Sequence, residues 1–110
     1  MGIFFITQRK DGEFQFNLKA GNGQTILTSQ GYTKKMSCEN GIVSVRSNSS
    51  DDSRFERMTS EGGQPYFNLK SSNGQVIGVS QMYADEASME NGIASVKTNA
   101  PDATVTDETV

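Results

Sequence analysis

The feature that most constrains the fold of this chain is an internal repeat with a period of 51 residues. A shift by this offset places Phe16–Lys19 on Phe67–Lys70, and the register then continues without a gap. Residues 4–54 and 55–105 carry 22 identical residues at 51 aligned positions. The chain is therefore a tandem duplication, and we expect its two repeats to share one structure.

Each repeat begins with three predicted strands. Its first segment is a largely apolar, β-favouring run that ends in turn residues. Its second segment alternates apolar and polar side chains, the period of a strand with one buried face. An Asn-Gly pair then marks a hairpin before the third strand. The predicted strands cover residues 4–8, 14–19 and 25–29 of the first repeat and residues 55–59, 67–69 and 76–80 of the second.

The hairpin between the second and third strands can be read in two registers. A two-residue Asn22-Gly23 loop would place the Lys19 side chain opposite Ile26, pairing a charge with an apolar position. A three-residue loop with Gly23 in the left-handed region places Leu18 opposite Ile26. We predict the second register, with Leu69 opposite Ile77 and Phe67 opposite Val79 in the second repeat.

After the third strand the apolar period changes to that of a helix. Cys38, Ile42 and Val45 are spaced i, i+4, i+7, and Met89, Ile93 and Val96 repeat this spacing. We predict an amphipathic helix on one face of the sheet. Gly41 and Gly92 lie inside it, which means that the helix approaches the sheet too closely for a side chain or breaks there. The alternative is a short helix followed by a strand from Ile42 to Arg46. Pro101 should end the second helix.

The C-terminal tail continues the repeat, because Ser53–Glu56 falls on Thr104–Asp107. Each repeat then becomes a β3-α-β unit. A unit of about 50 residues buries too little apolar surface to be stable alone. We therefore predict an α+β fold in which two tandem β3-α-β repeats share one antiparallel sheet, with the helices on one face and the closing strands exchanged. Residues 1–110 would form a single domain made of repeats at about 4–54 and 55–105.

Composition excludes several kinds of chemistry. Cys38 is the only cysteine and the chain has no histidine, which removes intramolecular disulfides, multi-thiolate zinc sites and histidine-dependent catalysis. No apolar run reaches the roughly 18 residues that a membrane helix needs. The apolar opening segment is too short for a signal peptide. We expect a cytoplasmic protein without a membrane partner.

Charge gives little support to a nucleic-acid partner. The net charge is −3, whereas a nucleic-acid-binding domain should be basic. Residues 4–54 carry seven basic and five acidic residues, and residues 55–110 carry three and eight. The alternative of weak nucleic-acid binding therefore depends on the basic side chains of the first repeat, which are Lys19, Lys34, Lys35 and Arg46.

The second repeat resembles a known family. The segments Phe67–Lys70, Asn73–Gly78, Ser80–Tyr83 and Asn91–Ala100 are similar to the tandem-repeat members of the YegP-like family of small bacterial proteins. The resemblance covers nearly the whole chain. It implies two β3-α-β units with exchanged final strands, an assembly that single-repeat members form as dimers. It implies no established molecular activity.

Polar residues repeated on the second strands are the candidate ligand-binding residues. Asn17, Lys19, Asn68 and Lys70 project from the strand face opposite the predicted core. If the helices cover only the apolar face, this polar face is open to a ligand or to solvent. Tyr32 and Tyr83 precede the helices and are interpreted as packing anchors.

No catalytic group is predicted. Glu39 and Glu90 are the only carboxylates shared by the two helices, and nothing brings them within the roughly 10 Å that glycosidase chemistry needs. Cys38 corresponds to Met89, as a replaceable apolar side chain would. We expect no metal and no cofactor. The favoured hypothesis is a non-catalytic binding or interaction module for an unknown small ligand or protein, acting as a monomer with internal pseudo-twofold symmetry. An enzyme of unknown class is the alternative.

Overall fold

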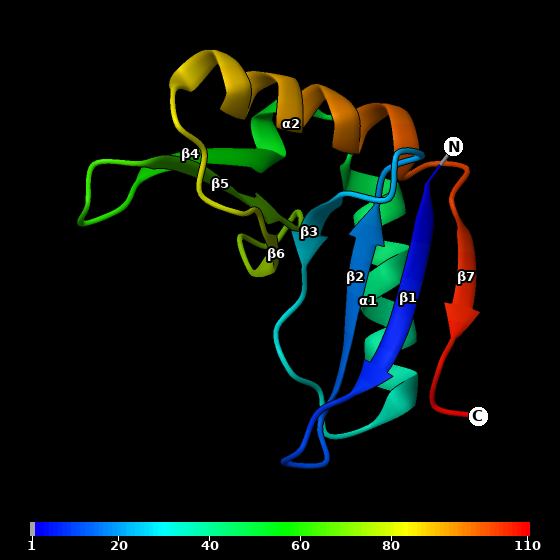
Figure 1. Cartoon of the computed structure of the whole chain (residues 1–110). Helices are drawn as coiled ribbons and strands as arrows, with labels where there is room; N and C mark the ends of the chain where they lie inside the picture. Colours follow the sequence, from blue (N-terminus) through cyan, green and yellow to red (C-terminus); the bar gives the residue numbers. More distant parts are fainter. Residues whose placement is uncertain (1) are drawn as a thin grey trace.

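The computed structural model describes residues 2–110, and its elements follow the order predicted from the repeat. Each repeat contributes three strands and a helix, and a further strand follows the second helix (Figure 1). The strands are β1 (Ile3–Gln8), β2 (Phe14–Lys19), β3 (Thr25–Thr28), β4 (Phe55–Thr59), β5 (Pro65–Lys70), β6 (Val76–Val79) and β7 (Thr104–Asp107). The helices are α1 (Lys35–Asn48) and α2 (Glu86–Asn99), and a 3-10 turn, η1 (Asp52–Arg54), precedes β4.

The strands form one sheet in the order β4-β5-β6-β3-β2-β1-β7. The two repeats meet where Thr28 of β3 pairs antiparallel with Val79 of β6. Exchanging the repeats maps β4, β5 and β6 onto β1, β2 and β3, so the sheet has a pseudo-twofold axis between β3 and β6. Each helix packs on strands of both repeats, since α1 contacts β2, β5 and β6 while α2 contacts β3 and β5.

The expectation of a purely antiparallel sheet is wrong at one edge, because β7 runs parallel to β1. Ile3 pairs with Thr104, and the Thr104 amide donates to the carbonyl of Gly2 at 3.2 Å. The reason is the connection: β7 returns to the sheet after the helix α2, and a helical crossover permits the parallel pairing that a hairpin cannot make.

The predicted exchange of closing strands is present, but the two strands are not equivalent. β4 follows α1 and pairs antiparallel with β5 of the second repeat, whereas β7 follows α2 and pairs with β1 of the first. β4 itself occupies the place that β1 has in the first repeat. Within residues 2–110 no strand lies outside β4, so the β1 edge is covered and the β4 edge is open.

The predicted hairpin register is correct at the turn and wrong beyond it. Ala20 and Gln24 close a three-residue loop in which Gly23 has a φ of 85°, and Lys19 pairs with Thr25. A β-bulge at Ile26 then shifts the register, so that Leu18 pairs with Leu27. The bulge turns two consecutive apolar residues toward the core, which strict alternation cannot do. The same bulge recurs in the second repeat, where Leu69 pairs with Gly78 instead of Ile77 and Val79 pairs with Asn68 instead of Phe67.

Both helices are continuous through their internal glycines, so the alternative of a helix followed by a strand is wrong. The glycine is required by close packing: a Cβ on Gly41 would lie 2.5 Å from Tyr32 Oη and 3.0 Å from Phe16 Cε2. α2 ends before Pro101, as predicted.

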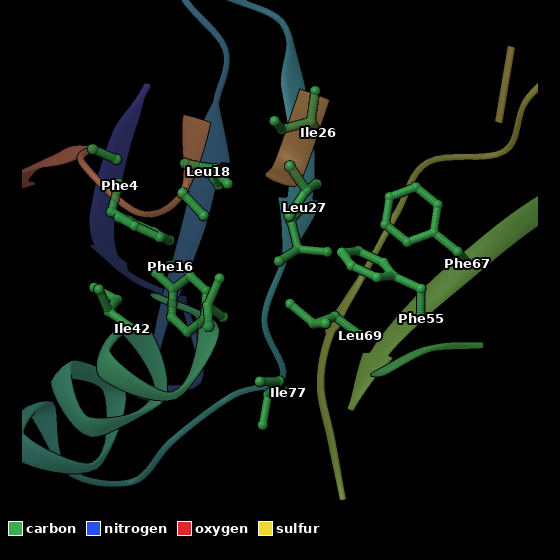
Figure 2. Close-up of a cluster of buried hydrophobic side chains, with 14 of the residues drawn as sticks. Phe4, Phe16, Leu18, Ile26, Leu27, Ile42, Phe55, Phe67, Leu69 and Ile77 are labelled. Atoms are coloured by element: carbon green, nitrogen blue, oxygen red, sulfur yellow. The ribbon is translucent and has the colours of Figure 1, made fainter. Parts of the chain in front are cut away.

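The core lies between the sheet and the two helices, and it draws on both repeats. Phe4 and Phe16 meet edge to face in the first repeat, as Phe55 and Phe67 do in the second (Figure 2). Near the pseudo-twofold axis the repeat counterparts Leu27 and Gly78 touch, and a Cβ on Gly78 would lie 2.6 Å from Leu27 Cγ. Two large side chains cannot share this place, which explains why the repeats differ there.

Candidate functional site

Two clefts are related by the pseudo-twofold axis, and each joins the helix of one repeat to a hairpin turn of the other. The α2 cleft, of about 410 Å³, lies between α2 and the β2–β3 turn. The α1 cleft, of about 270 Å³, lies between α1 and the β5–β6 turn. Every residue lining the α1 cleft has its repeat counterpart in the α2 cleft. The shared pairs are Gln30/Gln81, Tyr32/Tyr83, Asn40/Asn91, Gly41/Gly92, Ser44/Ser95, Asn73/Asn22, Gln75/Gln24, Ile77/Ile26 and Ser71/Ala20, and only the last pair differs in residue type.

The tyrosine of each cleft is fixed by its backbone and by its ring. The amide and carbonyl of Tyr32 both bond Phe14, each at 2.7 Å. The Tyr83 amide donates to the Pro65 carbonyl at 2.8 Å, and its ring stacks on Phe67 at a centroid distance of 6.4 Å. Burial raises the pKa of both phenols above the ordinary value, and the Gln30 side chain partly offsets the shift at Tyr32. Both hydroxyls are therefore protonated at neutral pH.

Amide side chains make up most of the hydrogen-bonding capacity of the clefts. Asn40 and Gln75 in the α1 cleft are exposed, and so are Asn91 and Gln24 in the α2 cleft. In the described part of the chain these four side-chain amides make no hydrogen bond. Repeated residues that serve the fold do make such bonds: Ser29 Oγ, for example, accepts from the buried amide of Phe16 at 2.9 Å. The fold thus gives no reason for the repetition of the four free amides.

Neither cleft is lined by a charged residue. Over residues 2–110 no group of three His, Cys, Asp or Glu side chains could hold a metal ion. The clefts thus offer neutral donors and acceptors on a partly apolar floor.

The four predicted ligand-binding residues lie elsewhere, on the sheet face opposite the helices. Asn17 Oδ1 accepts from Thr28 Oγ1 at 2.9 Å, and Lys19 Nζ lies 4.8 Å from the Phe5 ring centroid. Asn68 and Lys70 both donate to the carboxylate of Glu56, at 3.1 and 2.9 Å. The structure does not bring the four together, since each pair belongs to one half of the sheet and is engaged with neighbours in its own repeat. A ligand site on this face stays a prediction.

A third hollow, of about 480 Å³, opens between β3 and β6. Two identical repeat pairs line it, Ser29/Ser80 and Gln30/Gln81, whereas Thr25 and Thr28 of the first repeat are replaced by Val76 and Val79 in the second. Its two halves therefore match less closely in residue type than the two clefts do, although it shares Gln30 and Gln81 with them.

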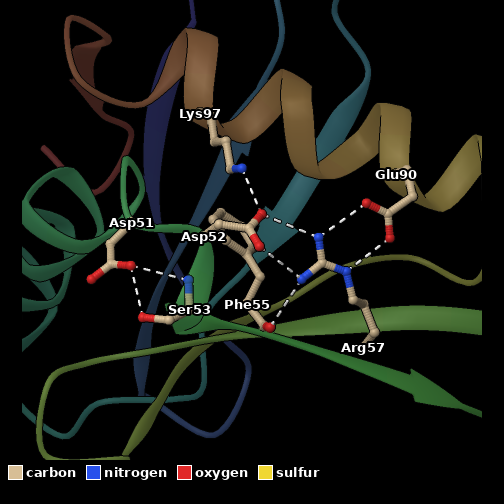
Figure 3. Close-up of polar contacts among 7 residues, drawn as sticks. All are labelled: Asp51, Asp52, Ser53, Phe55, Arg57, Glu90 and Lys97. Atoms are coloured by element: carbon tan, nitrogen blue, oxygen red, sulfur yellow. Dashed lines mark hydrogen bonds and ion pairs between the residues drawn. The ribbon is translucent and has the colours of Figure 1, made fainter.

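The two helix glutamates have different surroundings. Glu90 forms a bidentate pair with Arg57 of β4, at 2.8 and 3.0 Å, and Arg57 also contacts Asp52 (Figure 3). The bond to Arg57 lowers the pKa of Glu90. Lys97 completes this network through Asp52. Glu39 is exposed on the other helix and makes no ion pair in the described residues, so nothing joins the two glutamates in one site.

Cys38 lies on the buried face of α1, and burial is the main cause that raises its pKa to about 11. A protonated, inaccessible thiol is a poor nucleophile.

The sequence signal for the clefts is present in the repeat alignment, where Gln30 matches Gln81 and Asn40 matches Asn91. These repeated residues indicate a site only in the folded protein, where the helix of one repeat lies beside the hairpin turn of the other.

One sheet built from two strand-exchanged repeats, with a matched pair of uncharged clefts, defines a small two-repeat α+β protein. The chain belongs to the family described as "Domain of unknown function (DUF1508)", whose model matches residues 10–56 and 60–107. This confirms the resemblance to YegP-like proteins. None of the helices described over residues 2–110 is long and apolar enough to cross a membrane.

Relatives match over almost their full length. The chain is 56% identical over 108 residues to the UPF0339 protein YegP of Escherichia coli K12, covering 98% of both chains. It is 57% identical over 108 residues to a UPF0339 protein of Acinetobacter baylyi, covering 98% of this chain and 97% of the relative. As expected from the resemblance, these relatives bring no established activity.

Solved structures of relatives share the fold. The solution NMR structure of the Escherichia coli protein of unknown function yegP superposes with a TM-score of 0.93 at 55% identity, covering 97% of this chain and 92% of that one. A UPF0339 protein of Shewanella oneidensis gives a TM-score of 0.91 at 44% identity, covering 96% and 90%.

Proposed function

We propose that the protein is a non-catalytic binding module that takes a small, uncharged polar ligand in each of its two clefts. The observation that carries this proposal is the repetition of free amides: Asn40 and Gln75 in one cleft, Asn91 and Gln24 in the other. Residues that the fold requires are expected to stay identical in both repeats, but these side-chain amides make no hydrogen bond that stabilises the fold. A ligand that each cleft binds in the same way accounts for them.

The enzyme alternative has less support. Histidine is absent from the chain, and the one thiol is buried with a raised pKa. The protonated phenols of Tyr32 and Tyr83 are suited to donating hydrogen bonds to a ligand.

Nucleic-acid binding through the first repeat also has less support, because two of its basic side chains are engaged within the protein. Lys35 pairs with Asp107 at 2.9 Å, and Arg46 donates to the Pro101 carbonyl at 3.2 Å. An uncharged cleft lacks the basic groups that a phosphate backbone needs.

We further propose that residues 1–110 act as a single domain and as a monomer in the cytoplasm. A shared core supports the first part, and so does β7, which follows the helix of the second repeat and pairs with β1 of the first. The second repeat supplies within one chain what a partner would supply in a dimer.

The binding proposal can be tested by NMR on the uniformly ¹⁵N-labelled protein with mixtures of neutral and charged metabolites. Neutral ligands should shift the side-chain amide signals of Asn40 and Asn91. Shifts at Asn17 and Asn68 would instead favour the open sheet face, and shifts at neither pair with any metabolite would overturn binding by small ligands.

A further inference from the structure

We infer that the ligand of the twin clefts is a neutral, polyhydroxylated compound of the saccharide type. This inference rests on the proposed function and names the ligand class for the same site. It follows from three properties of the clefts: their lack of charge, the kind of hydrogen-bonding groups they carry and their partly apolar floor.

The clefts are less charged than the chain as a whole, because charged residues make up 21% of the chain and none lines either cleft. An anionic or cationic ligand is normally held by charge-assisted hydrogen bonds to an opposite charge. Phosphorylated compounds, free amino acids and nucleotides therefore lack the counter-charge that they would need here.

The hydrogen-bonding groups suit hydroxyls. Each side-chain amide of Asn40, Gln75 and their counterparts carries an acceptor oxygen beside two N–H donors, and each tyrosine adds a hydroxyl. A sugar hydroxyl both donates and accepts, so adjacent hydroxyls can be matched by one amide. A purely apolar ligand would leave these groups without partners, at a cost of about 1–3 kcal/mol for each group that it buries.

The floor of each cleft suits the apolar side of a sugar ring. Ile26 lines the α2 cleft together with Tyr83, and Ile77 lines the α1 cleft together with Tyr32. Ligand pockets commonly span about 300–1,000 Å³, so the α2 cleft, of about 410 Å³, is near the lower end of this range and the α1 cleft, of about 270 Å³, is just below it. Clefts of this size suit a small ligand of one or two sugar rings.

An extended peptide is a poorer fit, although it too can be uncharged. Peptides that bind through their backbone normally add to a free strand edge. Each cleft is lined mainly by a helix, the segment before it and a hairpin turn, and only Ile26 or Ile77 of its lining belongs to a strand. Such a peptide would therefore find little strand edge to pair with.

The test is a set of NMR titrations of the full-length ¹⁵N-labelled protein with single probes. The neutral sugars are glucose, maltose and N-acetylglucosamine, and the comparison probes are glucuronate, adenosine and a doubly blocked neutral dipeptide. At least one neutral sugar should give saturable shifts at the side-chain amides of Asn40 and Asn91, while glucuronate should give none.

The matched variants are Asn40→Ala with Asn91→Ala in the clefts, and Asn17→Ala with Asn68→Ala on the open sheet face. Asn40 and Asn91 are exposed, so their replacement should leave the backbone spectrum intact. Loss of one hydrogen bond per cleft should weaken sugar binding about 3- to 10-fold, followed in this variant at the side-chain amides of Gln24 and Gln75. The open-face variant should bind like the wild-type protein.

The outcomes separate the two proposals. Saturable cleft shifts with adenosine or the dipeptide, and none with any sugar, would overturn the saccharide class while supporting the binding function. No shift at either cleft with any probe would overturn both. Equal sugar binding by the wild-type protein and the Asn40→Ala, Asn91→Ala variant would place the site elsewhere.

Discussion

The hydroxyl of Tyr32 lies against the backbone of Gly41, so closely that a Cβ on this glycine would be 2.5 Å from Tyr32 Oη. The same contact recurs between Tyr83 and Gly92. The pair joins the helix to the segment that follows the third strand, and it forms one wall of each cleft. Fold and candidate site therefore depend on the same two residues in each repeat.

Replacing Gly41 with alanine should destabilise the protein, although alanine favours helix by about 1 kcal/mol over glycine. Overpacking against Tyr32 and Phe16 should cost about 1–3 kcal/mol and outweigh that gain. The free energy of unfolding in urea measures the effect. Tyr32→Phe combined with Gly41→Ala should recover part of the loss, because it removes the nearest atom.

Gly62→Ala is the matched control. A Cβ on Gly62 would meet nothing closer than Ser60 Oγ at 3.9 Å, and its backbone is not in the left-handed region. This variant should be as stable as the wild-type protein or slightly more stable. A Gly41→Ala protein as stable as the Gly62→Ala protein would contradict the close packing described here.

Arg57→Ile should promote self-association through the open edge of β4. Arg57 occupies the repeat position of Ile6, which is 1% exposed beside the β7-covered edge. Its guanidinium pairs with Glu90 and Asp52, and a charge pointing inward at a sheet edge opposes strand pairing. Sedimentation across concentration should show a larger average mass for Arg57→Ile than for the wild-type protein.

Arg9→Ile tests whether this effect is specific to the edge. Arg9 lies in the β1–β2 turn, where it pairs with Asp11 and Glu13. The substitution removes the same charge and adds the same apolar side chain away from the β4 edge. Equal association by both variants would show that added apolar surface alone, not the edge, drives it.

Much of this fold could be predicted from the sequence because the pattern of each strand and helix occurs twice, once in each repeat. The bulge at Ile26 is not evident from the sequence because strict alternation turns only one of two neighbouring residues inward, whereas Ile26 and Leu27 are both buried in the core. The parallel pairing of β7 depends on the crossover through α2, which no local pattern records. The clefts were missed because Asn40 meets Gln75 only through the packing of one repeat on the other.

The docking of β7 should weaken in acid through Asp107. Hydrogen bonds from Thr109 and Lys35 lower the pKa of this carboxyl from 3.8 to about 2. A group whose pKa is lower in the folded state stabilises the fold above its unfolded pKa and loses that contribution as the pH falls toward the folded value. The Asp107 contribution should therefore be complete above about pH 5 and be mostly lost at about pH 2.

The measurement for Asp107 is the melting temperature of the wild-type protein and of Asp107→Asn between pH 6 and pH 2. The wild-type protein should melt higher at pH 6, and the difference should shrink as the pH approaches 2. A difference that stays constant over this range would contradict a role for the Asp107 charge.

A fragment of residues 1–60 should fold only as a dimer. It contains β1 to β4 with α1, and its segment Ser53–Glu56 is the repeat counterpart of β7. In a dimer this segment could cover the β1 edge of the partner, as β7 covers β1 in the full chain. Circular dichroism and sedimentation should show folding and dimer formation rising together with concentration, whereas a folded monomer at every concentration would show that the repeats are independent.

The most direct test of two equivalent binding clefts is the stoichiometry of a neutral sugar that shifts the Asn40 and Asn91 signals. An NMR titration should give two sites per wild-type chain. Asn40→Ala should weaken binding in the α1 cleft alone, followed at the side-chain amide of Gln75, and leave the Asn91 signal with its wild-type dissociation constant. Asn91→Ala should weaken binding in the α2 cleft alone, followed at Gln24. A single site per chain, or the loss of both sites in either single variant, would contradict the claim.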